Sequence, residues 1–172
     1  MSASSKRLLL IDGHSMAYRA FYALPVDNFK TSAGQPTNAI YGFASMLINL
    51  IKEEQPTHLA VAFDVSRKTF RSEKFPEYKA NRSSTPDEFR SQMSHLNEMI
   101  ESFGIKHFEI EGYEADDIIA SLAKKAQLEN FQVLICTGDR DSFQLVNENV
   151  TVLYPKKGVT EMSRMTPNTV FE

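Results

Sequence analysis

The chain has 172 residues, of which 42% are apolar and 24% charged, a balance typical of one globular domain with its own core. A single cysteine, Cys136, excludes an internal disulfide and lies in an apolar run that predicts burial. No apolar run approaches the roughly 20 residues of a membrane span, and residues 1–7 contain no apolar stretch long enough for a signal peptide. We therefore expect a cytoplasmic protein, monomeric and without a membrane partner.

The first half of the chain alternates buried strands with an amphipathic helix. Residues 8–11 are a continuous apolar run that stops at Asp12, which predicts a strand buried on both faces. A helix is expected over 37–54, beginning with a threonine cap and ended by a proline. Residues 59–63 predict a second buried strand, which stops at Asp64.

The formal net charge of -3 argues mildly against a nucleic-acid partner, but the charge is unevenly distributed. The segment from Arg67 to Arg82 has no clean hydrophobic period and carries a net charge of +4. Its basic residues are Arg67, Lys68, Arg71, Lys74, Lys79 and Arg82. The acidic residues must therefore be concentrated elsewhere.

The second half continues the alternation of helices and strands. The sequence predicts one helix from a cap at Thr85 to Gly104 and another over 114–128. Strands are expected over 105–110, 131–136 and 150–154. A turn at 156–158, a strand over 159–162 and a helix start at Thr166 complete the chain. Such alternation predicts an α/β fold of three layers, in which a mostly parallel central sheet has helices on both faces. No repeat or interdomain linker divides residues 1–172.

Carboxylates follow three of the predicted strands. Asp12, Asp64 and Asp139 each lie at or just after a strand end, and Asp141 comes two residues later. The carboxyl ends of parallel strands meet at one edge of a sheet, which is where ligands bind. The cluster 114–117, with carboxylates at Glu114, Asp116 and Asp117, opens a helix that follows a strand and should reach the same edge.

Seven carboxylates in one cleft would repel one another and raise each other's pKa values. Bound divalent cations resolve this repulsion, and hard oxygen ligands favour Mg²⁺ or Mn²⁺ over zinc. The pattern therefore favours metal-dependent phosphoryl chemistry. Each group alone has a simpler interpretation, because an aspartate after a strand is often a turn or cap residue and acids stabilise a helix N-terminus. Their coincidence at one edge favours the chemical interpretation.

Seven short motifs extend over nearly the whole chain. They are Leu-Ile-Asp-Gly-His-Ser at 10–15, Arg-Ala-Phe-Tyr-Ala at 19–23, Ala-Phe-Asp at 62–64, Thr-Phe-Arg at 69–71, Tyr-Lys-Ala-Asn-Arg at 78–82, Glu-Ala-Asp-Asp-Ile-Ile-Ala at 114–120 and Thr-Gly-Asp-Arg-Asp at 137–141. In sequence and in order they resemble the 5′ nuclease family that includes the N-terminal 5′→3′ exonuclease domain of bacterial DNA polymerase I. The flap endonucleases and the PIN-like superfamily are more distant relatives.

The resemblance implies a PIN-like or resolvase-like nuclease core that binds two or more Mg²⁺ or Mn²⁺ ions. The implied ligands are Asp12, Asp64, Glu114, Asp116, Asp117, Asp139 and Asp141. Water activated by metal would attack a phosphodiester near a 5′ end, or at the base of a 5′ flap, in DNA or in an RNA primer–DNA hybrid. The implied roles are in DNA replication and repair.

The resemblance also implies how nucleic acid is held. The basic segment would form a helical arch that threads a 5′ single strand, with Lys79 and Arg82 at the scissile phosphate. Arg19 would face the phosphates, and Tyr78 would either stack on a base or pack on its neighbours. The other contacts would come from Arg67, Lys68, Arg71 and Lys74. His14 is expected to be structural.

Family members continue with a Gly-Asp-x-x-Asp-like motif and a helix-hairpin-helix element that grips duplex DNA, whereas this sequence stops at Glu172. We therefore expect the N-terminal part of a longer protein, and a fragment that binds branched or single-stranded nucleic acid without cutting it is one alternative. The other is a phosphohydrolase of the haloacid dehalogenase type. That class needs Asp-x-Asp after the first strand, whereas here Asp12 is followed by Gly13 and His14.

Overall fold

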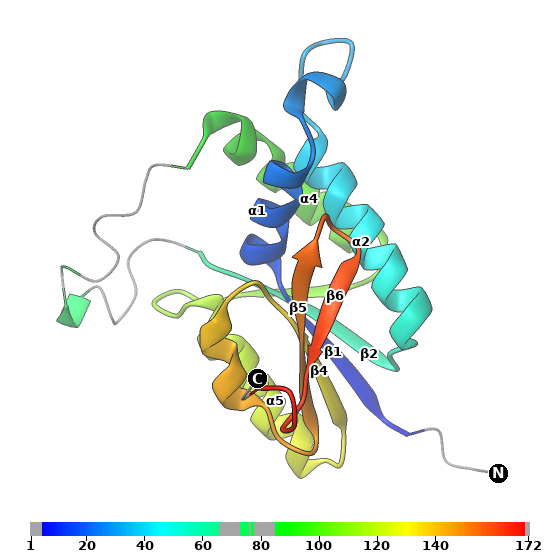
Figure 1. Cartoon of the computed structure of the whole chain (residues 1–172). Coiled ribbons are helices and arrows are strands. Elements are labelled where there is room, and N and C mark those ends of the chain that lie inside the picture. The colour runs from blue at the N-terminus through cyan, green and yellow to red at the C-terminus, as the bar shows by residue number, and fades with distance from the viewer. Residues whose placement is uncertain (1–4, 66–72, 76, 78–84, 171–172) are drawn as a thin grey trace.

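The computed structural model describes residues 5–65, 73–75, 77 and 85–170 (Figure 1). Its strands are β1 (Arg7–Asp12), β2 (His58–Phe63), β3 (Lys106–Glu109), β4 (Gln132–Cys136), β5 (Val150–Lys157) and β6 (Glu161–Met165). Its helices are α1 (Gly13–Ala23), α2 (Asn38–Glu54), α4 (Asp87–Ser102) and α5 (Ala115–Leu128), with short 3₁₀ helices η1 (Val26–Asn28) and η2 (Arg140–Leu145). In this part of the chain, no helix has both the length and the apolar character that crossing a bilayer requires.

The six strands form one sheet in the order β3-β2-β1-β4-β5-β6. Strands β1 to β5 are parallel to their neighbours, and β6 returns antiparallel to β5. The strand order reverses between β1 and β4, because β2 and β3 extend the sheet on one side of β1 and β4 and β5 extend it on the other. This reversal is a topological switch point, the place where open α/β sheets bind ligands at their carboxyl edge.

Both faces of the sheet are covered. Helices α1, α2 and α4 pack on one face and α5 on the other (Figure 1). Successive residues of a strand point to opposite faces, so Leu9 and Ile11 join the core under α1, α2 and α4, whereas Leu10 joins the core under α5. All three are at most 1% exposed. The predicted three-layer α/β class with a mostly parallel sheet is confirmed.

Helix α1 is not predicted from the sequence. Its buried residues Met16, Ala17, Ala20 and Phe21 recur at helical spacing and pack against α2 and the sheet. The side chain of Asp12 caps the helix, because its Oδ1 accepts a hydrogen bond from the backbone of the third helical residue. The strand end and the helix start are therefore built around the same carboxylate.

One predicted helix start differs from the structure, and a second lacks the predicted capping hydrogen bond. Helix α4 begins at Asp87 with Pro86 as its N-cap, so the predicted cap at Thr85 is one residue early. Pro86 has an extended ψ of 143°, which keeps it outside the helix. Helix α2 does follow Thr37, but the Thr37 side chain makes no capping hydrogen bond. Gly104 lies directly after the C-cap of α4 with φ +71°, as predicted.

The hairpin near the end of the chain lies later than predicted. Strand β5 continues to Lys157, the turn occupies 158–160, and β6 begins at Glu161. Gly158 is in the turn with φ +63°, a conformation that glycine adopts without strain. In place of the helix predicted from Thr166, the described residues show a turn over 167–170, in which the Val170 N–H donates to the Thr166 carbonyl at 3.0 Å.

Candidate active site

The carboxylate of Asp12 lies at the switch point and is almost fully buried, with 6% of the residue exposed. Its Oδ1 accepts a hydrogen bond from Ser15 N at 3.2 Å, and its Oδ2 accepts one from Thr137 Oγ1 at 3.0 Å. The next residue, Gly13, needs to lack a side chain, because a Cβ there would collide with the Phe63 ring. The junction of β1 and α1 thus holds Asp12 in one position.

Burial raises the pKa of Asp12 from its ordinary 3.8 to about 7, and the negative charges of Asp116 and then Asp64 act in the same direction. The hydrogen bonds from Ser15 and Thr137 oppose this rise without cancelling it. Carboxylates from β1, from the end of β2 and from the start of α5 therefore share one electrostatic environment. Among the residues that the structure describes, the charges that act on this buried acid are all negative.

Asp64 follows β2 and connects this edge to α5. Its Oδ1 accepts a hydrogen bond from Ala115 N at 2.6 Å, at the first residue of the helix. Its own backbone N–H donates to His14 Nδ1 at 3.4 Å, so this nitrogen of the ring carries no proton. Within α5, Asp117 Oδ2 accepts a hydrogen bond from Glu114 N at 3.0 Å. These acids therefore also stabilise the N-terminus of α5.

Asp139 and Asp141 lie on the other side of the switch point, where β4 leads into η2. Asp139 is half-buried, and its backbone N–H donates to Thr137 Oγ1 at 3.1 Å. Its Oδ1 accepts a hydrogen bond from Asp141 N at 2.9 Å. Asp141 is exposed, and its backbone makes this contact. Asp12 and Asp139 are thus connected through the Thr137 hydroxyl.

All seven predicted ligands therefore lie at or after the carboxyl ends of parallel strands. Over residues 5–65, 73–75, 77 and 85–170, no three acidic, histidine or cysteine side chains form a ready-made cage for a metal ion. The predicted donors are carboxylate oxygens, and Mg²⁺ usually keeps several waters while taking only one or two protein carboxylates. Carboxylate oxygens are thus a donor set that fits a hydrated divalent cation.

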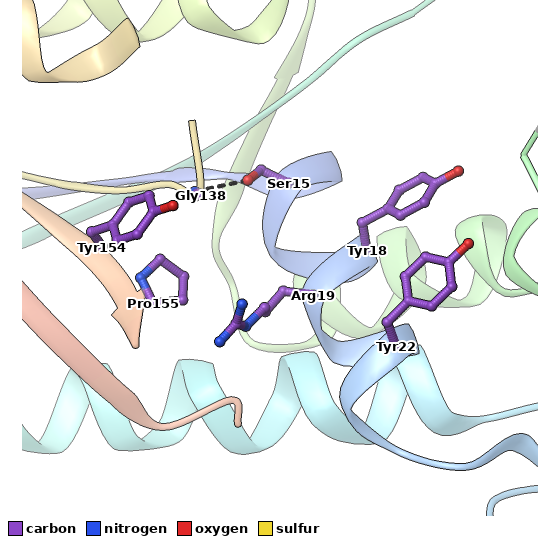
Figure 2. A pocket seen from close by; sticks show the side chains of 7 residues that line it. All are labelled: Ser15, Tyr18, Arg19, Tyr22, Gly138, Tyr154 and Pro155. Carbon is purple, nitrogen blue, oxygen red and sulfur yellow. Dashed lines mark hydrogen bonds between the residues drawn. The ribbon is translucent and has the colours of Figure 1, made fainter. Parts of the chain in front are cut away.

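A pocket of about 300 Å³ opens beside the switch point, between α1 and β5 (Figure 2). The Arg19 side chain reaches into it and donates hydrogen bonds to the carbonyls of Lys156 at 2.9 Å and Gly158 at 3.2 Å. Arg19 therefore braces the β5–β6 turn, and its contact with phosphates stays a prediction. Within the basic segment 67–82, the structure describes Lys74, which is exposed. The other predicted nucleic-acid residues, Arg67, Lys68, Arg71, Tyr78, Lys79 and Arg82, lie outside the described residues.

Two hydroxyl residues of the site are not singled out from the sequence. Ser15 and Thr137 each lie within three residues of a strand-end aspartate, and both hydrogen bond across the switch point. Their position beside the motif aspartates is the signal that could have identified them. Cys136 is fully buried, as predicted.

The raised pKa of Asp12 predicts how the stability of the metal-free protein depends on pH. The folded pKa of about 7 exceeds the ordinary 3.8, so the folded state binds more protons between these values and stability falls as pH rises through them. Each pKa unit is worth about 1.4 kcal/mol, so the full loss from Asp12 should be about 4 kcal/mol, of which about 3 kcal/mol falls between pH 4.5 and pH 8. Urea unfolding in EDTA at pH 4.5 and pH 8 measures it.

Asp12→Asn is the control for this pH dependence, because it removes the titrating group and leaves all others in place. The variant should lose less stability than the wild type between pH 4.5 and pH 8. Identical losses in both proteins would show that Asp12 does not titrate in this range.

The fold and the site together define a class: a resolvase-like α/β domain with carboxylates gathered at the switch point of its parallel sheet. The chain belongs to the family described as 5′-3′ exonuclease, N-terminal resolvase-like domain, which matches residues 7–172. This confirms the resemblance found in the motifs.

Curated relatives agree with this membership. DNA polymerase I of Mycobacterium bovis is 59% identical over 165 residues, which cover 96% of this chain and 18% of that protein. DNA polymerase I of Lactococcus lactis subsp. cremoris is 52% identical over 170 residues, which cover 96% of this chain and 19% of that protein. The chain thus spans less than a fifth of the length of these relatives.

Solved structures show the same fold at lower identity. The T5 D15 protein, co-crystallized with metal ions, superimposes with a TM-score of 0.68 at 23% identity, over 87% of this chain and 55% of that one. The catalytic core of Rad2 in complex with a DNA substrate superimposes with a TM-score of 0.57 at 17% identity, over 97% of this chain and 49% of that one.

Proposed function

We propose that this chain is the catalytic core of a structure-specific, metal-dependent 5′ nuclease. It hydrolyses phosphodiester bonds at 5′ ends and 5′ flaps of DNA, and in RNA primers, during replication and repair. The observation that carries the proposal is the buried Asp12, whose pKa is raised by burial and by the acids Asp116 and Asp64 at the switch point. A buried acid with other negative charges acting on it is suited to binding cations. The similarity to DNA polymerase I supports the same activity.

The cations are Mg²⁺ or Mn²⁺, and two or more are held by Asp12, Asp64, Glu114, Asp116, Asp117, Asp139 and Asp141. When bound, such ions supply a water that is nucleophilic at neutral pH and stabilise charge on the phosphate. The T5 D15 protein, which has the same fold, was co-crystallized with metal ions. Hydrogen bonds to Asp12, Asp64 and Asp139 hold their carboxylates in place, so that the side chains are not free to rotate.

The substrate is DNA with a 5′ flap or a 5′ end, or an RNA primer–DNA hybrid. Lys79 and Arg82 contact the scissile phosphate. The remaining contacts come from Arg19, Arg67, Lys68, Arg71, Lys74 and Tyr78. The Rad2 core, which shares the fold, was solved with a DNA substrate. We place the protein in the cytoplasm, as a monomer.

A gel assay on a labelled 5′-flap duplex tests the proposal. The chain should release the flap in Mg²⁺ or Mn²⁺, and EDTA should abolish release. Binding of the flap without release in either metal would favour the alternative in which the chain only holds branched nucleic acid. Release of inorganic phosphate from small phosphomonoesters, without cutting of the flap, would instead favour a phosphohydrolase.

A further inference from the structure

Thr137 occupies a position beyond the last backbone pairing of β1 with β4. The register of these strands ends at Ile11 opposite Cys136, so Asp12 and Thr137 are the next residues in line. Where the backbone pairing stops, a side-chain hydrogen bond of 3.0 Å joins Thr137 Oγ1 to Asp12 Oδ2. This bond continues the connection between the two strands past the end of the ladder, where the chain leaves β1 and β4 by different routes.

The direction of each hydrogen bond at Thr137 follows from its partners. A hydroxyl has one proton and can accept two further hydrogen bonds. The backbone N–H of Asp139 can only donate, so Thr137 Oγ1 accepts from it at 3.1 Å. The hydroxyl proton is then available for Asp12 Oδ2. Thr137 is fully buried, so water does not compete for either bond.

A second connection runs parallel to the first. Gly138 N donates to Ser15 Oγ at 2.8 Å (Figure 2), and Ser15 N donates to Asp12 Oδ1 at 3.2 Å. Both oxygens of Asp12 are therefore held, one from each side of the switch point. The result is a closed ring of contacts that connects the start of α1 to the loop after β4.

We propose that Thr137, supported by Ser15, is a positioning residue that fixes Asp12 and Asp139 relative to each other so that both can serve the same metal centre. The inference rests on the proposed function, in which both aspartates are ligands. The Thr137 hydroxyl binds the side chain of one aspartate and the backbone of the other, so it sets their relative position. Residues behind a ligand that fix its orientation typically change metal affinity or activity by 10- to 100-fold when removed.

The test compares Thr137→Val with Thr137→Ser. Valine keeps the shape of threonine without the hydroxyl, whereas serine keeps the hydroxyl without the methyl group. Calorimetric titration of the chain with Mn²⁺ should show an affinity about 10- to 100-fold weaker for T137V. T137S should stay within about threefold of the wild type. Single-turnover cleavage of a 5′-flap duplex should follow the same order, and duplex affinity in EDTA should not change.

Thermal unfolding in EDTA shows whether T137V folds, and Ser15→Ala is the second variant. S15A should weaken Mn²⁺ binding by severalfold, because it removes the acceptor for Gly138 N while Thr137 remains. If T137V is unfolded, S15A with wild-type Mn²⁺ affinity overturns the inference. If T137V is folded, two results would overturn the inference. One is T137V binding Mn²⁺ with wild-type affinity, and the other is T137S binding Mn²⁺ as weakly as T137V.

These outcomes are distinct from failure of the proposed function. A wild-type chain that neither binds Mn²⁺ nor cuts the flap would contradict the metal-dependent nuclease itself. A wild type that does both, alongside a T137V variant that is unchanged, would leave the nuclease in place and reject only the role of Thr137.

Discussion

Replacing Asp12 by Asn should lower cleavage of a 5′-flap duplex by about 10³-fold or more, although the variant should be more stable than the wild type at pH 8. A metal ligand contributes several kcal/mol to stabilising the transition state, and each 1.4 kcal/mol is a tenfold change in rate. Stability should rise because the substitution removes a buried charge that is unfavourable in the absence of metal. Loss of activity would then not be due to unfolding.

Single-turnover rates in Mg²⁺ and urea unfolding in EDTA measure the two effects. Asp27→Asn is the matched control, because Asp27 is exposed in η1 and pairs with Lys30. It should leave both quantities close to wild type. An Asp12→Asn protein that cuts within tenfold of wild type would remove Asp12 from the metal site.

Replacing Lys79 by Ala should lower the single-turnover cleavage rate by about 10²- to 10³-fold with little effect on duplex affinity. The motif Tyr-Lys-Ala-Asn-Arg at 78–82 places Lys79, by family resemblance, at the scissile phosphate. A cation there acts on charge that grows in the transition state, so its removal slows the chemical step. Lys79 lies outside the described residues, and this prediction rests on the motif.

Lys74→Ala is the matched control, from the same basic segment. A lysine that contacts only a distant phosphate should weaken affinity and reduce the salt dependence of binding by about one unit, without slowing the chemical step. Binding titrations in Ca²⁺ measure affinity, and saturating enzyme isolates the rate. If Lys79→Ala shows the pattern expected of Lys74→Ala, Lys79 is only a tether and Arg82 is the next residue to test.

The sequence predicted the centre of the fold because buried parallel strands appear as continuous apolar runs. The runs 8–11, 59–63 and 131–136 correspond to β1, β2 and β4, the three strands around the switch point. The aspartates at their ends could be placed at one edge as soon as the strands were taken to be parallel. This part of the site depends on local sequence and on a general property of α/β sheets.

The remaining features depend on contacts between distant segments. The bond between Thr137 and Asp12 joins residues 125 positions apart and requires the register of β1 with β4. The N-terminus of α2 also depends on a distant segment, because the backbone N–H groups of Ala39 and Ile40 donate to Gln92 of α4. Those bonds are 2.8 and 3.2 Å long. A threonine at a helix start indicates a cap, but only the packing of α2 on α4 decides which side chain provides it.

A metal centre at the switch point can be tested by titrating the ¹⁵N-labelled chain with Mn²⁺ and following its amide signals by NMR. Mn²⁺ broadens signals near its binding site, so those of Asp12, Asp64, Ala115 and Asp139 should disappear first. Signals of Leu128, at the far end of α5, should persist. Mg²⁺ in excess should restore the lost signals by competition. Broadening that spares the carboxyl edge of β1, β2 and β4, or that is uniform over the chain, would contradict a metal centre at the switch point.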